Sequence, residues 1–183
     1  MTLEIWQLTA TELKQKIAAG EISAREATKS HLSRMEQVNG KLNAVAESCE
    51  KEALIEADLV DKKLQKGGKI GALAGIPVTV KVNVDQKGYA TTNGLQLQKE
   101  LIAEIDNPVV NNLRKAGAII IGRTNTPAFS LRWFTRNTIH GHTKNPLNPV
   151  VTPGGSSGGA AAAVAAGIGT IGHGTDIAGS IRY

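Results

Sequence analysis

Small residues crowd one end of the sequence, where residues 152–183 hold nine of the chain's 20 glycines. Glycine has no Cβ, so it allows tight turns and close approach of neighbouring backbones. Between Gly158 and Ala166 the run is mostly alanine, the strongest helix former. We therefore expect a helix over residues 158–166, ended by Gly167 and packed closely against its neighbours.

Two capping boxes predict helices near the N-terminus. In each, a Ser or Thr is followed three residues later by Glu: Thr9 with Glu12, and Ser23 with Glu26. The helices should end near residues 20 and 40, where glycines occur. Apolar residues at helical spacing predict a third helix over about residues 46–66, which Gly67 and Gly68 end.

The middle of the chain alternates strand and helix patterns. Residues 77–84 place valines on one face and Thr79, Lys81 and Asn83 on the other, as in a strand. A helix should begin at Asn107–Pro108, and residues 118–121 form an apolar run typical of a buried parallel strand. Residues 168–172 could form a further strand, and residues 133–149 an irregular loop. The order predicts an α/β fold with a mixed, largely parallel sheet covered by helices on both faces.

Composition limits the classes of function. The formal net charge is +5, but the basic residues are spread along the chain, which argues only weakly for a nucleic-acid surface. A single cysteine, Cys49, excludes an internal disulfide and favours a reducing compartment, so we expect a cytoplasmic protein. The N-terminus lacks signal-peptide features, and the apolar run 160–168 is too short to cross a bilayer, so no membrane association is expected.

Three interpretations of Gly154–Gly159 follow from the residues alone. The stretch could be purely structural, with Ser157 as a helix N-cap. A phosphate loop fails, because no Gly-Lys-Ser/Thr follows and the dinucleotide spacing is absent. A nucleophile elbow around Ser156 also fails, because it needs an acid and then a histidine downstream, whereas His173 precedes Asp176.

Several blocks of sequence, in order, resemble the amidase signature family. The main blocks are GIPVTVK (75–81), TPGGSSGG (152–159) and GTDIAGSIR (174–182). Supporting blocks are TTNG (91–94), GRTN (122–125) and NPLNP (145–149). The resemblance covers nearly the whole chain and implies the amidase signature fold.

The resemblance also implies a Ser–cis-Ser–Lys triad. Ser180 matches the nucleophile, Ser156 the bridging serine with a cis peptide bond, and Lys81 the base; the two serines lie 24 residues apart. The family's oxyanion hole maps to the backbone of Ile177, Ala178 and Gly179, with the Ser180 N–H beside them. Supporting positions are Ser157, Thr175, Asp176 and Arg182. The resemblance implies neither a metal nor a cofactor.

The chemistry of such a triad sets one physical requirement. A serine is a weak nucleophile until a base takes its proton. Lysine has an ordinary pKa of about 10.4, so it serves as a base near neutral pH only if burial lowers that pKa. Taken alone, Lys81 would be a solvent-reaching strand residue and Ser180 a turn residue. Only the joint pattern points to catalysis.

Two positions depart from the family pattern. Val82 stands where Asp is common, and Ala178 where Gly is common. Alanine is penalised if φ must be positive there. Asp176 and Arg182 are expected to form a structural pair. The loop residues His140 and His142 should be solvated, whereas His173 is a candidate lining residue.

The chain is also short for the family, whose domains are more than twice as long. We expect residues 1–183 to be the N-terminal part of one domain, with a helical lead-in over about 1–68 and an α/β core from about 69. A C-terminal segment or a homo-oligomer partner should complete it. The expected activity is hydrolysis of a small-molecule carboxylic amide. The alternatives are the ammonia-generating subunit of a tRNA-dependent amidotransferase, which would involve nucleic acid, and a catalytically silent binding or assembly module.

Overall fold

A four-stranded sheet forms the centre of the computed structural model, which describes residues 3–183. Its order is β1-β3-β2-β6, with bounds β1 (Val45–Ser48), β2 (Pro77–Lys81), β3 (Ile119–Thr124) and β6 (Ile171–Gly172). β2 runs parallel to both β3 and β6, whereas β1 is antiparallel to β3. The predicted mixed, largely parallel sheet is confirmed.

Five α-helices surround the sheet in the described part of the chain: α1 (Ala10–Ala18), α2 (Ala24–Leu42), α3 (Glu50–Gln65), α4 (Pro108–Lys115) and α5 (Gly158–Ala165). Thr9 and Ser23 cap α1 and α2 through the predicted capping boxes, and Asn107 caps α4. Three short 3₁₀ turns are η1 (Ile5–Gln7), η2 (Gln96–Gln98) and η3 (Ala128–Ser130). None of the helices in residues 3–183 has the length and apolar character needed to span a membrane.

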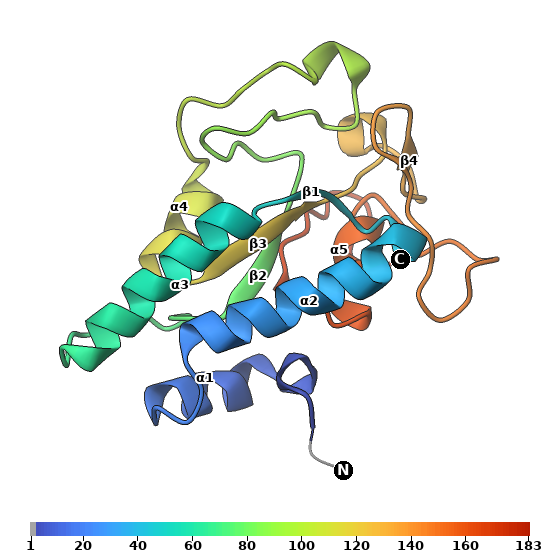
Figure 1. The fold of residues 1–183 in the computed structure, drawn as a ribbon. Coiled ribbons are helices and arrows are strands. Elements are labelled where there is room, and N and C mark those ends of the chain that lie inside the picture. Colours follow the sequence, from blue (N-terminus) through green and yellow to red (C-terminus); the bar gives the residue numbers. More distant parts are fainter. Residues whose placement is uncertain (1–2) are drawn as a thin grey trace.

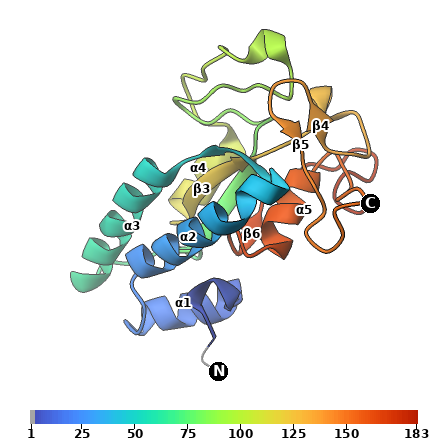
Figure 2. The same ribbon diagram turned by 45° about the vertical axis from the view of Figure 1, so that its right-hand side comes forward.

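Two apolar clusters lie against the sheet, as expected from alternation along β3. Ile119 and Ile121 pack in one cluster with residues of α2, α3 and α5. Ile120 packs in the other, with Val78 and Val80 of β2 and residues of α1 and α4. Figure 1 shows α2 and α3 crossing in front of β2 and β3, and Figure 2 shows α5 beside β6 with α1 below α2. Helices therefore cover both faces.

The predicted third helix starts too early. Residues 45–48 form β1 at the sheet edge, and α3 begins only at Glu50. Asn43 ends α2 in a left-handed conformation with φ 53°. The Asn39 side chain then accepts the N–H groups of Ala44 and Val45, both at 2.9 Å, so the chain leaves helical geometry. Local polar bonds here compete with helix formation.

The strand predicted over residues 77–84 ends at Lys81. The Val82 N–H still donates to the Thr124 carbonyl at 3.1 Å, but the chain then leaves the sheet in a long excursion up to α4, at the top of Figure 1. The strand at 118–121 instead runs on to Thr124. The two terminal nitrogens of the buried Arg123 guanidinium donate there to Glu47 and to the carbonyls of Ala90 and Val84.

Two further predictions need adjustment. Of the strand predicted over residues 168–172, only Ile171–Gly172 is regular. The loop over residues 133–149 is mostly irregular but contains a two-stranded hairpin, β4 (Arg136–Asn137) with β5 (Gly141–His142).

The start of α5 packs directly on backbone, so Gly159→Ala should destabilise the protein. An added Cβ would lie 2.6 Å from the Asn125 nitrogen and 2.9 Å from the Ala44 oxygen, atoms that cannot yield easily. Such overpacking typically costs about 1–3 kcal/mol, measurable by denaturant unfolding of the intact protein. Gly40→Ala is the matched control, because this glycine is exposed within α2 and a Cβ there meets nothing within 4 Å. Equal stability of the two variants would contradict the packing.

Candidate active site

A buried lysine stands at the end of β2, the strand that β3 and β6 flank. Lys81 is 0% exposed, and its Nζ meets three hydroxyl oxygens. Ser156 lies at 2.7 Å, Thr175 at 2.9 Å and Ser157 at 3.1 Å. The fold thus brings together side chains from three separate sequence blocks. No ion pair to Lys81 occurs within the described residues.

The two serines of the glycine-rich stretch hold different positions. The peptide bond between Gly155 and Ser156 is cis. Ser157 occupies the N-cap position of α5, but its side chain makes no capping bond, contrary to the purely structural interpretation. Its hydroxyl donates to the Thr175 carbonyl and accepts the Thr175 N–H, both at 3.1 Å. Because its proton is used, Ser157 can only accept from Lys81, so one lysine N–H is held there.

The surroundings of Lys81 favour its neutral form. Burial lowers the pKa of Lys81 to about 8, because the charged ammonium loses solvation. His173 lies beside it, with Nδ1 at 3.5 Å from the Lys81 backbone nitrogen. Burial, and then the Lys81 charge, lower the pKa of His173, so this imidazole is neutral when the lysine titrates. The candidate lining residue His173 therefore does lie at the site.

Ser180 lies on the loop that follows β6. Its carbonyl accepts the Ser157 N–H at 3.1 Å, which ties this loop to the start of α5. Ser180 and Ser156 line one hollow of about 410 Å³, together with Thr175 and Asn83. All three predicted catalytic residues therefore come from segments that meet at this place.

The Ser180 loop is braced by the predicted pair of Asp176 and Arg182. The guanidinium lies at 2.8 and 3.1 Å from the carboxylate oxygens. These bonds, with the backbone N–H of Gly179 at 2.6 Å, hold the pKa of Asp176 well below its usual range. The carboxylate is therefore a structural anchor.

This anchoring changes the predicted oxyanion hole. The Gly179 N–H donates to Asp176, so in this structure it is not free to bind an oxyanion. The N–H groups of Ile177 and Ala178 have no hydrogen-bond partner within residues 3–183. The left-handed position in the loop falls on Gly179, with φ 99°, and not on Ala178. An alanine at 178 is therefore compatible with the backbone.

Sequence reasoning missed other residues around the site. The Asn83 amide donates to both Ser130 and Thr175 at 3.3 Å; its place on the Lys81 face of the strand pattern was the available signal. Phe129, Leu131 and Trp133 line the hollow, but no motif marked them. His140 was expected to be solvated, which is wrong: it is half-buried and lies 2.7 Å from the Thr92 hydroxyl. His142 is exposed, as expected.

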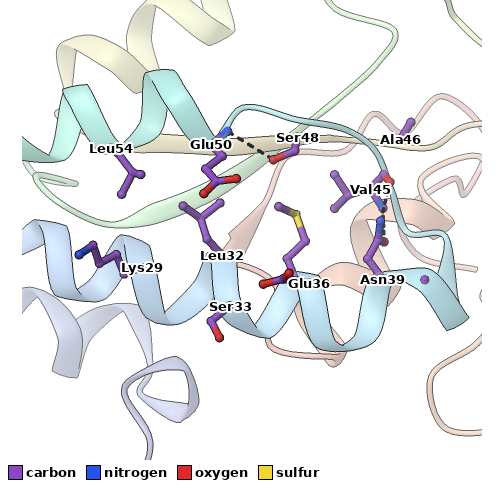
Figure 3. A pocket seen from close by; sticks show the side chains of 12 residues that line it. Lys29, Leu32, Ser33, Glu36, Asn39, Val45, Ala46, Ser48, Glu50 and Leu54 are labelled. Atoms are coloured by element: carbon purple, nitrogen blue, oxygen red, sulfur yellow. Dashed lines mark hydrogen bonds between the residues drawn. The ribbon is translucent and has the colours of Figure 1, made fainter.

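A second groove, of about 610 Å³, lies elsewhere, between α2 and the start of α3. Figure 3 shows Leu32, Glu36, Asn39 and Ser48 on its walls, with the Ser48 hydroxyl accepting the Glu50 N–H. None of the predicted catalytic residues lines it. The candidate site is therefore the hollow at Ser156 and Ser180.

The lowered lysine pKa predicts a pH profile. Below a pH of about 8 Lys81 is protonated and cannot accept a proton, so kcat/KM of any reaction in which Lys81 acts as the base should fall about tenfold per pH unit. Above about pH 8 it should reach a plateau. Initial rates between pH 6 and 10 measure this. A limb near pH 10.4, where an ordinary lysine titrates, would contradict burial as the controlling effect.

Comparison with known proteins identifies the family of the chain. The model of the family described as Amidase matches residues 26–183. The chain belongs to the amidase family. An indoleacetamide hydrolase of Bradyrhizobium diazoefficiens is 54% identical over 98% of the chain, which spans 34% of that relative. A glutamyl-tRNA(Gln) amidotransferase A subunit of Alkaliphilus metalliredigens is 38% identical over 98% of the chain, and the match covers 37% of that subunit's length.

Solved structures of amidases share the fold. A fatty acid amide hydrolase matches all of the chain with a TM-score of 0.95 and 35% identity, over 33% of its own length. A bacterial aryl acylamidase of the amidase signature family matches 96% of the chain with a TM-score of 0.91 and 34% identity, over 36% of its length. This amidase chain thus spans about a third of the proteins it matches, in line with the expectation of an incomplete domain.

Proposed function

We propose that the protein is a serine hydrolase that cleaves carboxylic amides to an acid and ammonia or an amine. Neutral Lys81 accepts the Ser156 proton while Ser156 accepts that of Ser180, whose oxygen attacks the amide carbon. The proton returns by the same route to the leaving nitrogen as the C–N bond breaks. Water then hydrolyses the acyl-Ser180 ester, with the same residues taking its proton.

One observation carries this proposal most: a fully buried lysine faces hydroxyl groups and no carboxylate. Burying an ammonium without a counter-charge is costly, so burial shifts the equilibrium of Lys81 toward the neutral amine and brings its pKa down to about 8. The 2.7 Å contact with Ser156 provides a direct path for a proton. A silent assembly module would have no need of this arrangement, which favours the enzyme over that alternative.

The walls of the hollow favour an amide of an apolar, aromatic acid. Phe129, Leu131, Trp133 and Ile177 line it, and each is more than half exposed at its surface. Aromatic rings stack well on such surfaces. The similarity to an indoleacetamide hydrolase supports the same substrate class, an arylacetamide.

The amidotransferase alternative has its own support. Several relatives about 37–40% identical are glutamyl-tRNA(Gln) amidotransferase A subunits. Arg132 also lines the hollow and could pair with the carboxylate of glutamine. In that case the ammonia would pass to a partner-bound acceptor, and tRNA would be required.

A substrate panel on the intact protein distinguishes these functions. We expect ammonia release from indoleacetamide at least tenfold faster, by kcat/KM, than from acetamide or glutamine, and no release by Ser180→Ala. Release from glutamine that depends on glutamyl-tRNA and a partner protein would instead support the amidotransferase. No turnover of any amide, with wild-type folding intact, would contradict both.

A further inference from the structure

The indole of Trp133 reaches the loop that carries Ser180. Its Nε1–H donates to the Ala178 carbonyl at 3.3 Å. On the other side, the Gly179 N–H donates to Asp176 at 2.6 Å. The Ala178 carbonyl and the Gly179 N–H belong to one planar trans peptide, so they point in opposite directions. This peptide is therefore held from both sides.

The same tryptophan makes a second contact with this loop. Its ring centroid lies 5.6 Å from that of Tyr183, whose backbone N–H donates to the Gly179 carbonyl at 2.8 Å. Before it in the chain, Phe129 and Ser130 both have φ 56°, a left-handed conformation that non-glycine residues rarely adopt. Such conformations persist where the surroundings over-determine them, and they cluster at functional sites.

We infer that Trp133 is a positioning residue for the proposed amide hydrolysis, which holds the Ala178–Gly179 peptide so that Ser180 and the preceding free N–H groups face the substrate. A peptide plane that cannot rotate restricts the motion of the planes on either side of it. The Ala178 N–H, one residue before the held peptide, then points where an oxyanion forms. Preorganised donors of this kind act without reorganisation during reaction.

The inference rests on the proposed function. A positioning role of Trp133 should change kcat, whereas stacking of the substrate on its ring should change KM, so the two roles can be distinguished by kinetics. Trp133→Phe keeps an aromatic surface but removes the donor. We expect kcat for an arylacetamide to fall about tenfold, equivalent to about 1.4 kcal/mol, with KM changed less than twofold. A trifluoromethyl ketone should also bind about tenfold more weakly. Its carbonyl carbon bonds to Ser180 Oγ as the Ser180 proton passes through Ser156 to Lys81, and its oxygen becomes an oxyanion.

Two further variants of the protein make the test specific. Replacement of Trp133 by β-(3-benzothienyl)alanine keeps the shape of the indole without its N–H and should reproduce the loss. Trp6→Phe, at the other tryptophan in η1, should leave kcat unchanged. An unchanged kcat in both Trp133 variants, or a raised KM alone, would overturn the positioning role while leaving the proposed function in place. An inactive wild-type protein would overturn both.

Discussion

Replacing Lys81 by methionine should lower kcat for amide hydrolysis by about 10³–10⁴-fold, with little effect on folding. Methionine fills the space of the buried lysine but cannot accept a proton. The three hydroxyls around Nζ would remain, so any residual rate measures what Ser156 and Ser180 achieve without a base. Stopped ammonia assays with purified intact protein give kcat, and thermal unfolding checks the fold.

A matched control separates loss of the base from loss of positive charge. Lys87 lies in the excursion after β2 and is exposed, so Lys87→Met should keep wild-type kcat. The residual activity of Lys81→Met should also lose the acid limb near pH 8, because the group that titrates there is gone. Normal turnover in Lys81→Met would contradict a proton relay through Lys81.

Replacing Ser180 by alanine should have an effect at least as large, about 10⁴-fold or more in kcat, because no acyl-enzyme can form. Substrate binding should change little, since the apolar walls of the hollow are untouched. KM and kcat on an arylacetamide test this directly. Ser33→Ala, at an exposed serine of α2, is the control and should behave as wild type.

Combining the two variants gives a further check. The effects of substituting residues that act as one unit are strongly non-additive. The kcat of the double variant Lys81→Met with Ser180→Ala should therefore be no lower than that of Ser180→Ala alone. Multiplicative losses would mean that Lys81 acts on some step other than activation of Ser180.

Local signals predicted much of this fold. Thr9, Ser23 and Asn107 marked helix starts because side-chain caps are decided within a few residues. β1 was missed because its residues become a strand only through pairing with β3, far along the chain. The polar end of β3 was missed for a similar reason: Arg123 is tolerated in a buried strand because Glu47 of β1 and carbonyls of the excursion after β2 accept its protons.

The site residues, like the fold, could be predicted from the sequence only in part. The resemblance pointed to Lys81, Ser156 and Ser180, and the fold brings their segments together. The short-range pattern of residues 77–84 also placed Asn83 on the Lys81 face, but nothing in the sequence indicated its bond to Thr175. The hydrogen bonds from Trp133 to Ala178 and from Gly179 to Asp176 depend on the geometry of loops. The periodicity of a sequence carries no information about such geometry.

Labelling with an alkyl fluorophosphonate tests the central claim most directly, because the probe bonds to an activated serine and loses fluoride. We expect one label on the intact protein, mapped by peptide mass spectrometry to Ser180. The labelling rate should rise with pH to a plateau above about 8, and labelling should be abolished in Lys81→Met. A label on Ser156 would contradict Ser180 as the nucleophile. So would a protein that hydrolyses amides but whose Ser180 the probe does not label.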